Sequence, residues 1–168
     1  YWYLNSNNSR RGIDAGIILT QAAIERLSFA YAVRDRRLIE AKGFKDLRAS
    51  DKFRLLFSSM DIPIDIPSDL EELTALAGQL NWLDAPHALT EVRNSLVHPE
   101  HKQRDRLENS YLDAWMLGLW LLELSILRLC GYNGTYSNRL VSRSVGQVEN
   151  VPWAPSQKAE EKSENQES

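Results

Sequence analysis

The chain has 168 residues, which is enough for one domain with a single core about two layers thick. Apolar residues make up 43% of the sequence and charged residues 26%, a balance that excludes a disordered acidic chain and favours a soluble globular domain. Cys130 is the single cysteine, so a disulfide framework and a cysteine zinc cluster are excluded. We therefore expect a reducing, cytoplasmic location.

The formal net charge of −3 is carried by the end of the chain, where residues 149–168 hold five acidic and two basic side chains. Residues 1–148 are neutral overall, so no global basic field indicates a nucleic-acid partner. A site for such a partner would have to rest on a local patch. The sequence begins with Tyr1 rather than Met, and we expect a piece of a longer protein with further domains.

The first element that the sequence predicts is one long amphipathic helix, from about residue 13 to residue 39. Residues 1–12, rich in Asn and Ser, are expected to form an irregular lead-in. Gly43 is expected to separate the long helix from the next one. The apolar residues that recur at helical spacing are Ile13, Ile17, Ile24, Leu27 and Tyr31.

Two shorter helices are predicted next, on either side of an extended connector. Ser50 or Asp51 is suited to cap the first of them, which ends before residue 61. Residues 63–67 are extended, because a residue that precedes a proline is pushed out of the α region. Ser68 and Glu71 fit a capping box that opens a helix to about residue 80.

The following helix has clear signals at both ends. Asp84 is suited to cap it, and Pro86 falls in the first turn, where a missing N–H costs little. The helix must end near His98, because Pro99 disfavours helical geometry at the residue before it.

A final helix is predicted from about residue 105 to residue 129, closed by Gly131. The stretch from Leu112 to Leu129 is apolar, but Asp113, Glu123 and Arg128 interrupt it, so we expect a buried bundle or dimer helix and no membrane role. The domain would thus cover residues 13–147. Residues 148–168 are expected to be a disordered acidic tail.

One segment carries residues suited to chemistry. At about 100° per residue and with Val92 as zero, Arg93 lies near 100°, Asn94 near 200° and His98 near 240°. This polar face points away from the core, and Asn94 and His98 are neighbours four residues apart. A solvated face with a histidine favoured by the helix dipole explains the pattern as well as a site does. The predicted core face is Ala85, Ala88, Leu89, Val92 and Leu96.

Residues 89–99 resemble the Arg-x(4–6)-His signature of HEPN domains, in which a polar residue often follows the arginine. Further similarity to the Apea-like HEPN group extends over about residues 13–141, in the segments 22–27, 50–56, 66–67 and 131–132. The resemblance implies an all-α, HEPN-type bundle with two long antiparallel helices and shorter helices between them. It also implies a homodimer in which two motifs face each other and cleave RNA without metal, often in phage defence or toxin systems.

The residue types suit RNA cleavage, because RNA carries its own nucleophile, the 2′-OH. His98 can transfer a proton, the Arg93 guanidinium can hold phosphate oxygens, and Asn94 can orient either of them. We expect no cofactor and no metal site, since His87, His98 and His101 lack a metal-binding spacing.

A local basic patch follows the motif, formed by His101, Lys102, Arg104 and Arg106. It is suited to follow an RNA backbone, although a solvated loop and helix start explains it equally. The sequence therefore predicts a metal-independent endoribonuclease with Arg93, Asn94 and His98 as catalytic residues. Two alternatives remain: a non-catalytic HEPN module that binds nucleotide or a partner, and a structural helical interaction domain.

Overall fold

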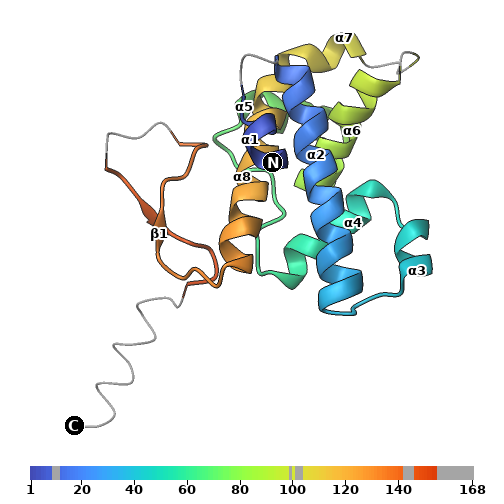
Figure 1. Cartoon of the computed structure of the whole chain (residues 1–168). Helices are drawn as coiled ribbons and strands as arrows, with labels where there is room; N and C mark the ends of the chain where they lie inside the picture. Colours follow the sequence, from blue (N-terminus) through green and yellow to red (C-terminus); the bar gives the residue numbers. More distant parts are fainter. Residues whose placement is uncertain (9–11, 99, 101–103, 142–145, 155–168) are drawn as a thin grey trace.

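The structure is a computed structural model that describes residues 1–8, 12–98, 100, 104–141 and 146–154, with the backbone alone at 104 and 105 (Figure 1). The chain is 65% helical and includes a two-stranded sheet, which confirms the predicted all-α class. In chain order the elements are α1 (Trp2–Ser6), α2 (Ile13–Phe29), the π-helix η2 (Ala30–Asp35), α3 (Ala41–Asp46), α4 (Ala49–Ser59), α5 (Glu71–Leu80), α6 (Ala85–Val97), α7 (Arg104–Leu107), the 3₁₀ helix η3 (Glu108–Ser110), α8 (Tyr111–Leu129), β1 (Thr135–Tyr136) and β2 (Glu149–Asn150).

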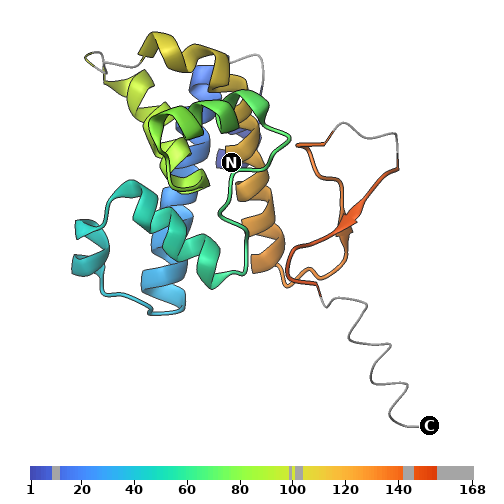
Figure 2. The ribbon, with the colours of Figure 1, turned by 180° about the vertical axis from the view of Figure 1, so that it is seen from behind.

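Helices α2 and α8 lie side by side at the centre of the bundle and run in the same direction (Figures 1 and 2). Gly16 faces Trp115, and one turn further along both helices Thr20 faces Gly118. The prediction that the two long helices are antiparallel is therefore wrong. The five α-helices α3 to α7 separate them in sequence, and together these return the chain to the end of the bundle where α2 began.

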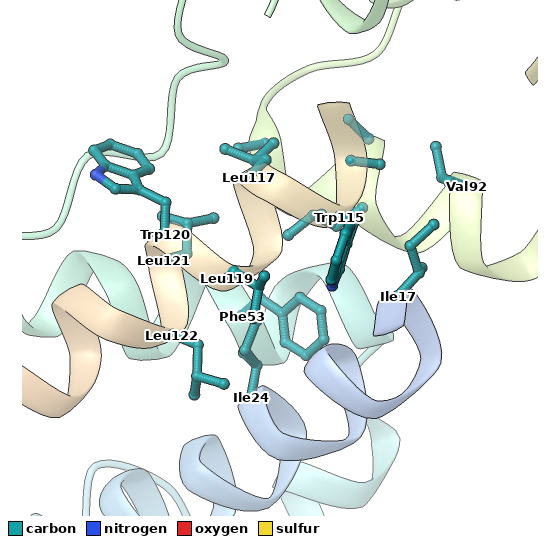
Figure 3. Packing of buried hydrophobic residues seen from close by; sticks show 14 of the residues in the cluster. Ile17, Ile24, Phe53, Val92, Trp115, Leu117, Leu119, Trp120, Leu121 and Leu122 are labelled. Atoms are coloured by element: carbon teal, nitrogen blue, oxygen red, sulfur yellow. The ribbon is translucent and has the colours of Figure 1, made fainter. Parts of the chain in front are cut away.

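The core lies between α2, α4, α6 and α8 (Figure 3). Small residues allow the two central helices to approach closely: a Cβ on Gly16 would lie 2.5 Å from Trp115 Nε1. The labelled side chains of Figure 3 that are at most 1% exposed are Ile17, Ile24, Phe53, Val92, Leu117, Leu119 and Leu121. Among the described residues, no helix is both long enough and apolar enough to cross a membrane.

The long first helix is shorter than predicted. Its α-helical part ends at Phe29 and continues as η2, in which Arg36 N–H donates to the Tyr31 carbonyl 2.8 Å away, five residues back. Arg37 then takes a positive φ of 51°, and Leu38 N–H closes the end on the Ala32 carbonyl. Hydrophobic spacing could not reveal this change, because a wider turn shifts the apolar positions only gradually.

The predicted caps of the two short helices are wrong. Helix α4 begins after Arg48 and α5 after Leu70, and neither of these residues caps its helix with a side chain. Asp51 lies inside the first turn of α4, where its carboxylate pairs with Arg54. The capping box at Ser68 also fails, because Leu70 N–H instead donates to the Pro67 carbonyl 3.1 Å away and closes a turn.

The last predicted helix, 105–129, is divided in three. Helix α7 gives way to η3, and α8 begins at Tyr111. Leu107 is fully buried at this break. The division reorients the chain so that α7 crosses the end of the bundle before α8 enters the core (Figure 1).

Both terminal segments contain regular structure that the sequence did not predict. Helix α1 lies in the predicted lead-in and is held by a 2.8 Å hydrogen bond from Trp115 Nε1 to the Ser6 carbonyl. At the other end β2 pairs with β1, and Val151 is 2% exposed. The predicted disorder is therefore wrong for residues 148–154, whereas residues 155–168 lie outside the described residues.

Candidate functional site on helix α6

The N-terminus of α6 is fixed by Asp84, as predicted. Its carboxylate accepts a hydrogen bond from His87 N–H at 2.9 Å, and Pro86 occupies the first turn. The same carboxylate pairs with Arg54 of α4 through Nε and Nη2. The hydrogen bond to Asp84 raises the pKa of the Arg54 guanidinium.

The middle of α6 is attached to α2 and α8. Gln21 is 5% exposed and donates from Nε2 to the Leu89 carbonyl, one turn before Arg93. Ser95 is fully buried and lies 3.2 Å from the Tyr111 hydroxyl at the start of α8. These polar contacts set the position of α6 between its neighbours and therefore the direction of its exposed face.

The predicted core face of α6 is correct over its first two turns and shifts at its end. Ala85, Ala88, Leu89 and Val92 are at most 1% exposed. Ser95 replaces Leu96 as the fully buried residue of the last turn, and Leu96 is half-buried at the edge of the core.

Arg93 is half-buried beside a pocket of about 90 Å³ between α2, α4 and α6. Within the described ranges its guanidinium forms no ion pair, because Glu25, the carboxylate of this pocket, is 2.8 Å from Lys52 Nζ. The other residues around the pocket are Ile18, Gln21, Ala22, Ala49, Phe53 and Thr90.

The structure brings Arg93 and Asn94 together but separates Asn94 from the imidazole of His98. Arg93 Nη1 donates to Asn94 Oδ1 at 3.4 Å. His98 is the C-terminal cap, with φ −112° and ψ 105°, and its exposed side chain makes no hydrogen bond to Asn94 in the described structure. The backbone N–H of His98 donates to the Asn94 carbonyl at 3.0 Å, which completes the helix. Asn94 thus contacts the arginine rather than the histidine.

The predicted RNA-binding patch falls largely outside the described residues. His101 and Lys102 lie there, as does the side chain of Arg104. Arg106 is exposed and donates from Nη2 to Gln79 Oε1 at 3.2 Å, so it faces α5. Among the described residues, no group of three or more His, Cys, Asp or Glu side chains is placed to hold a metal ion.

Sequence reasoning missed the residues that position the motif: Gln21, Ser95 and Tyr111. Gln21 and Ser95 occupy helix positions where spacing predicts apolar side chains, and a polar residue on an apolar face was the available signal. Their partners come from other elements, so no spacing within one segment could identify the pairs.

Comparison with known proteins gives a family. The family model described as the YopA C-terminal domain matches residues 1–150. The chain is also similar to the SPbeta prophage-derived uncharacterized protein YopA of Bacillus subtilis (strain 168), with 33% identity over 154 residues. This alignment covers 90% of the chain and 34% of that protein, so the chain spans about a third of the length of this relative. No solved structure matches the chain, and nothing in these comparisons links it to the HEPN superfamily.

Proposed function

The chain belongs to the YopA C-terminal domain family, and we propose that it cleaves RNA at a metal-independent site formed by Arg93, Asn94 and His98. The HEPN resemblance of residues 89–99 supports this proposal. The observation that carries it is geometric: a guanidinium and an amide lie in the last turns of α6 and an imidazole at its C-terminal cap, and three neighbouring helices hold α6 in place.

In this proposal the three side chains act on phosphate. His98 is exposed at the helix end, where a substrate can reach its imidazole. Asn94 Oδ1 accepts from Arg93 and so restricts the guanidinium, while the amide Nδ2 would donate to a phosphate oxygen. Arg93 would then stabilise the negative charge that builds on the phosphate.

In the proposed reaction the 2′-oxygen attacks the neighbouring phosphorus, and the bond from phosphorus to the 5′-oxygen breaks. A base removes the proton of the 2′-OH, and an acid donates a proton to the leaving 5′-oxygen. The products are a 2′,3′-cyclic phosphate and a free 5′-OH. Neutral imidazole is suited to the first role and imidazolium to the second, since histidine titrates near neutrality.

One copy of the motif supplies one imidazole, whereas the reaction needs both a base and an acid. We therefore propose a homodimer in which the two His98 side chains share the substrate. Val97 is half-buried between Arg93 and His98 on the face that would meet the partner. The relative described above is prophage-derived, which is in keeping with a role for this chain in phage defence or a toxin system.

The test is a cleavage assay on structured RNA in millimolar EDTA. The wild-type protein should cleave, and the product should carry a 2′,3′-cyclic phosphate. His98→Ala should lower the rate by about 10²–10⁴-fold, the usual contribution of a positioned acid or base. Arg93→Ala should have a comparable effect, and Arg93→Lys should restore little, because an ammonium lacks the two-pronged geometry of the guanidinium.

Arg48→Ala provides the matched control, since Arg48 is exposed at the start of α4, outside the proposed site. Melting curves for all variants separate loss of chemistry from loss of folding. Wild-type cleavage by His98→Ala, or a requirement for magnesium, would refute the mechanism. RNA or nucleotide binding without cleavage would favour the non-catalytic alternative, and an active monomer in light scattering would refute the shared site.

A further inference from the structure

A groove of about 860 Å³ lies along α2 next to the Arg93 pocket. We call it the α2–α3 groove and define it by the aromatic side chains of Trp2 and Phe29 and the cationic side chains of Arg26, Arg34 and Lys45. These residues come from α1, α2, η2 and α3. Its volume falls in the range of about 300–1,000 Å³ that is usual for ligand sites.

The groove has a local excess of positive charge in a domain that is neutral overall. Arg26, Arg34 and Lys45 are exposed, and in the part of the chain that the structure covers none of them forms an ion pair. The fourth cation, Lys52, is paired with Glu25 at 2.8 Å. Three cations without a carboxylate partner therefore surround one apolar surface, an arrangement that repels other cations and favours an anionic ligand.

The π-helix η2 builds the wall of this groove. In an α-helix, residues five positions apart lie about 140° apart around the axis. The wider π turn, closed by i→i+5 bonds, reduces that offset and brings the Arg34 guanidinium over the Phe29 ring, 5.2 Å from its centroid. Phe29 is itself held edge-on by Phe44 at 5.4 Å. A guanidinium over an aromatic ring thus lines the groove, and nucleobases stack on aromatic rings and guanidinium planes.

The α2–α3 groove adjoins the pocket of Arg93. Ala22 and Glu25 line both hollows, and Ile18, 36% exposed, lies beside them on the same helix. A chain molecule that occupies the groove and crosses α2 at these residues therefore arrives at the guanidinium of Arg93.

We propose that the α2–α3 groove binds the single-stranded RNA that flanks the bond cleaved at Arg93 and His98. This inference rests on the proposed function and adds the path of the substrate. A single strand of RNA carries one phosphate charge and one planar base per nucleotide. The cations of the groove would bind the phosphates, and its aromatic rings would stack on the bases. A lipid or fatty acid is less well suited, because its single anionic head group cannot pair with three separate cations.

The test measures binding rather than cleavage, with a fluorescent single-stranded oligouridine whose 2′-O-methyl sugars lack the attacking hydroxyl. Anisotropy is recorded between 50 and 200 mM salt, conditions chosen because each phosphate contact contributes about −0.7 to the slope of log K against log salt. If the wild-type protein makes three phosphate contacts in the groove, the slope of log K against log salt should be about −2 or steeper. Lys45→Gln should reduce the slope by about 0.7 and, at 0.1 M salt, weaken binding about fivefold.

The double variant Arg34→Gln/Lys45→Gln should lose about 1.4 from the slope. The matched control is Lys42→Gln, because Lys42 is exposed on the same helix as Lys45 but does not line the groove. A slope unchanged in the double variant, a loss equal to that in Lys42→Gln, no binding of the oligonucleotide by wild type, or a preference for anionic vesicles would each overturn the inference.

Failure of this inference is distinguishable from failure of the proposed function. If the wild-type protein cleaves RNA but the groove variants keep the full salt dependence of RNA binding, the catalytic proposal is retained and the groove is rejected. If the wild-type protein does not cleave RNA but the groove variants lose salt dependence of RNA binding, the catalytic proposal is rejected and the RNA-binding groove is retained.

Discussion

Replacing Gly16 by alanine should separate α2 from α8, because no space exists for one methyl group at this crossing. A Cβ on Gly16 would lie 2.5 Å from Trp115 Nε1, 2.8 Å from Cε2 and 2.9 Å from Cδ1. The indole has little freedom to move, since it is 8% exposed and its N–H donates to the Ser6 carbonyl at 2.8 Å. Either the helices part or this hydrogen bond to α1 breaks.

The free energy of unfolding should fall by about 1–3 kcal/mol. Forcing one carbon into a packed core costs about 1–3 kcal/mol. Loss of the indole hydrogen bond adds about 1 kcal/mol. Alanine is better than glycine in a helix by about 0.5–1 kcal/mol, which offsets the hydrogen-bond term. For a domain of this size the melting temperature should fall by about 2–12 °C.

The assay is thermal unfolding followed by circular dichroism, with Gly78→Ala as the matched control. Gly78 lies within α5, and a Cβ there meets no atom within 4 Å. The same chemical change should therefore stabilise the protein by about 0.5–1 kcal/mol and raise the melting temperature. A melting temperature of Gly16→Ala at or above the wild-type value would refute the packing argument.

Further substitutions test other contacts. Asp84→Ala removes a helix cap and leaves Arg54 with Asp51 as its only carboxylate partner, so urea unfolding should show a loss of about 2–3 kcal/mol, while Asp84→Asn keeps the cap and loses less. Burial raises the pKa of Tyr3 above 10.0, so native-state stability should decline as pH rises through that higher pKa; alkaline titration should show a shallower decline for Tyr3→Phe. Leu89→Ala, at a side chain 1% exposed, should cost about 2–5 kcal/mol in the same urea assay, and Leu96→Ala less, because Leu96 is half-buried.

Helix α6 could be predicted from sequence because its boundaries depend on neighbouring residues. Three residues mark these boundaries: an aspartate that accepts a hydrogen bond from the first turn, a proline within that turn and a proline after the last residue. Each affects only the few residues next to it in sequence. Regular helix geometry also applies to Arg93, whereas His98 has non-helical backbone angles, so its direction could not be derived from helical spacing.

The relation between elements could not be predicted in this way. Apolar spacing indicates that α2 and α8 each have a buried face. It does not indicate whether the two helices pack parallel or antiparallel, and here they are parallel. The π turn after Phe29 arises where the chain must both continue α2 and reach α3. Ser95 is buried and Leu96 half-buried because the Tyr111 hydroxyl, from another helix, provides a polar partner in the core.

The parallel pairing of α2 with α8 also determines when this protein can fold. The contacts that join the two ends of the domain span 109 residues between Ser6 and Trp115 and 120 residues between Tyr3 and Glu123. Closing such long loops has an entropic cost that neighbouring helix pairs avoid, so this bundle should fold slowly for an all-helical domain. During synthesis on the ribosome, the apolar face of α2 at Ile17 and Ile24 stays exposed to water until α8 has emerged. Until that moment the nascent domain should expose an apolar surface of the kind that chaperones bind.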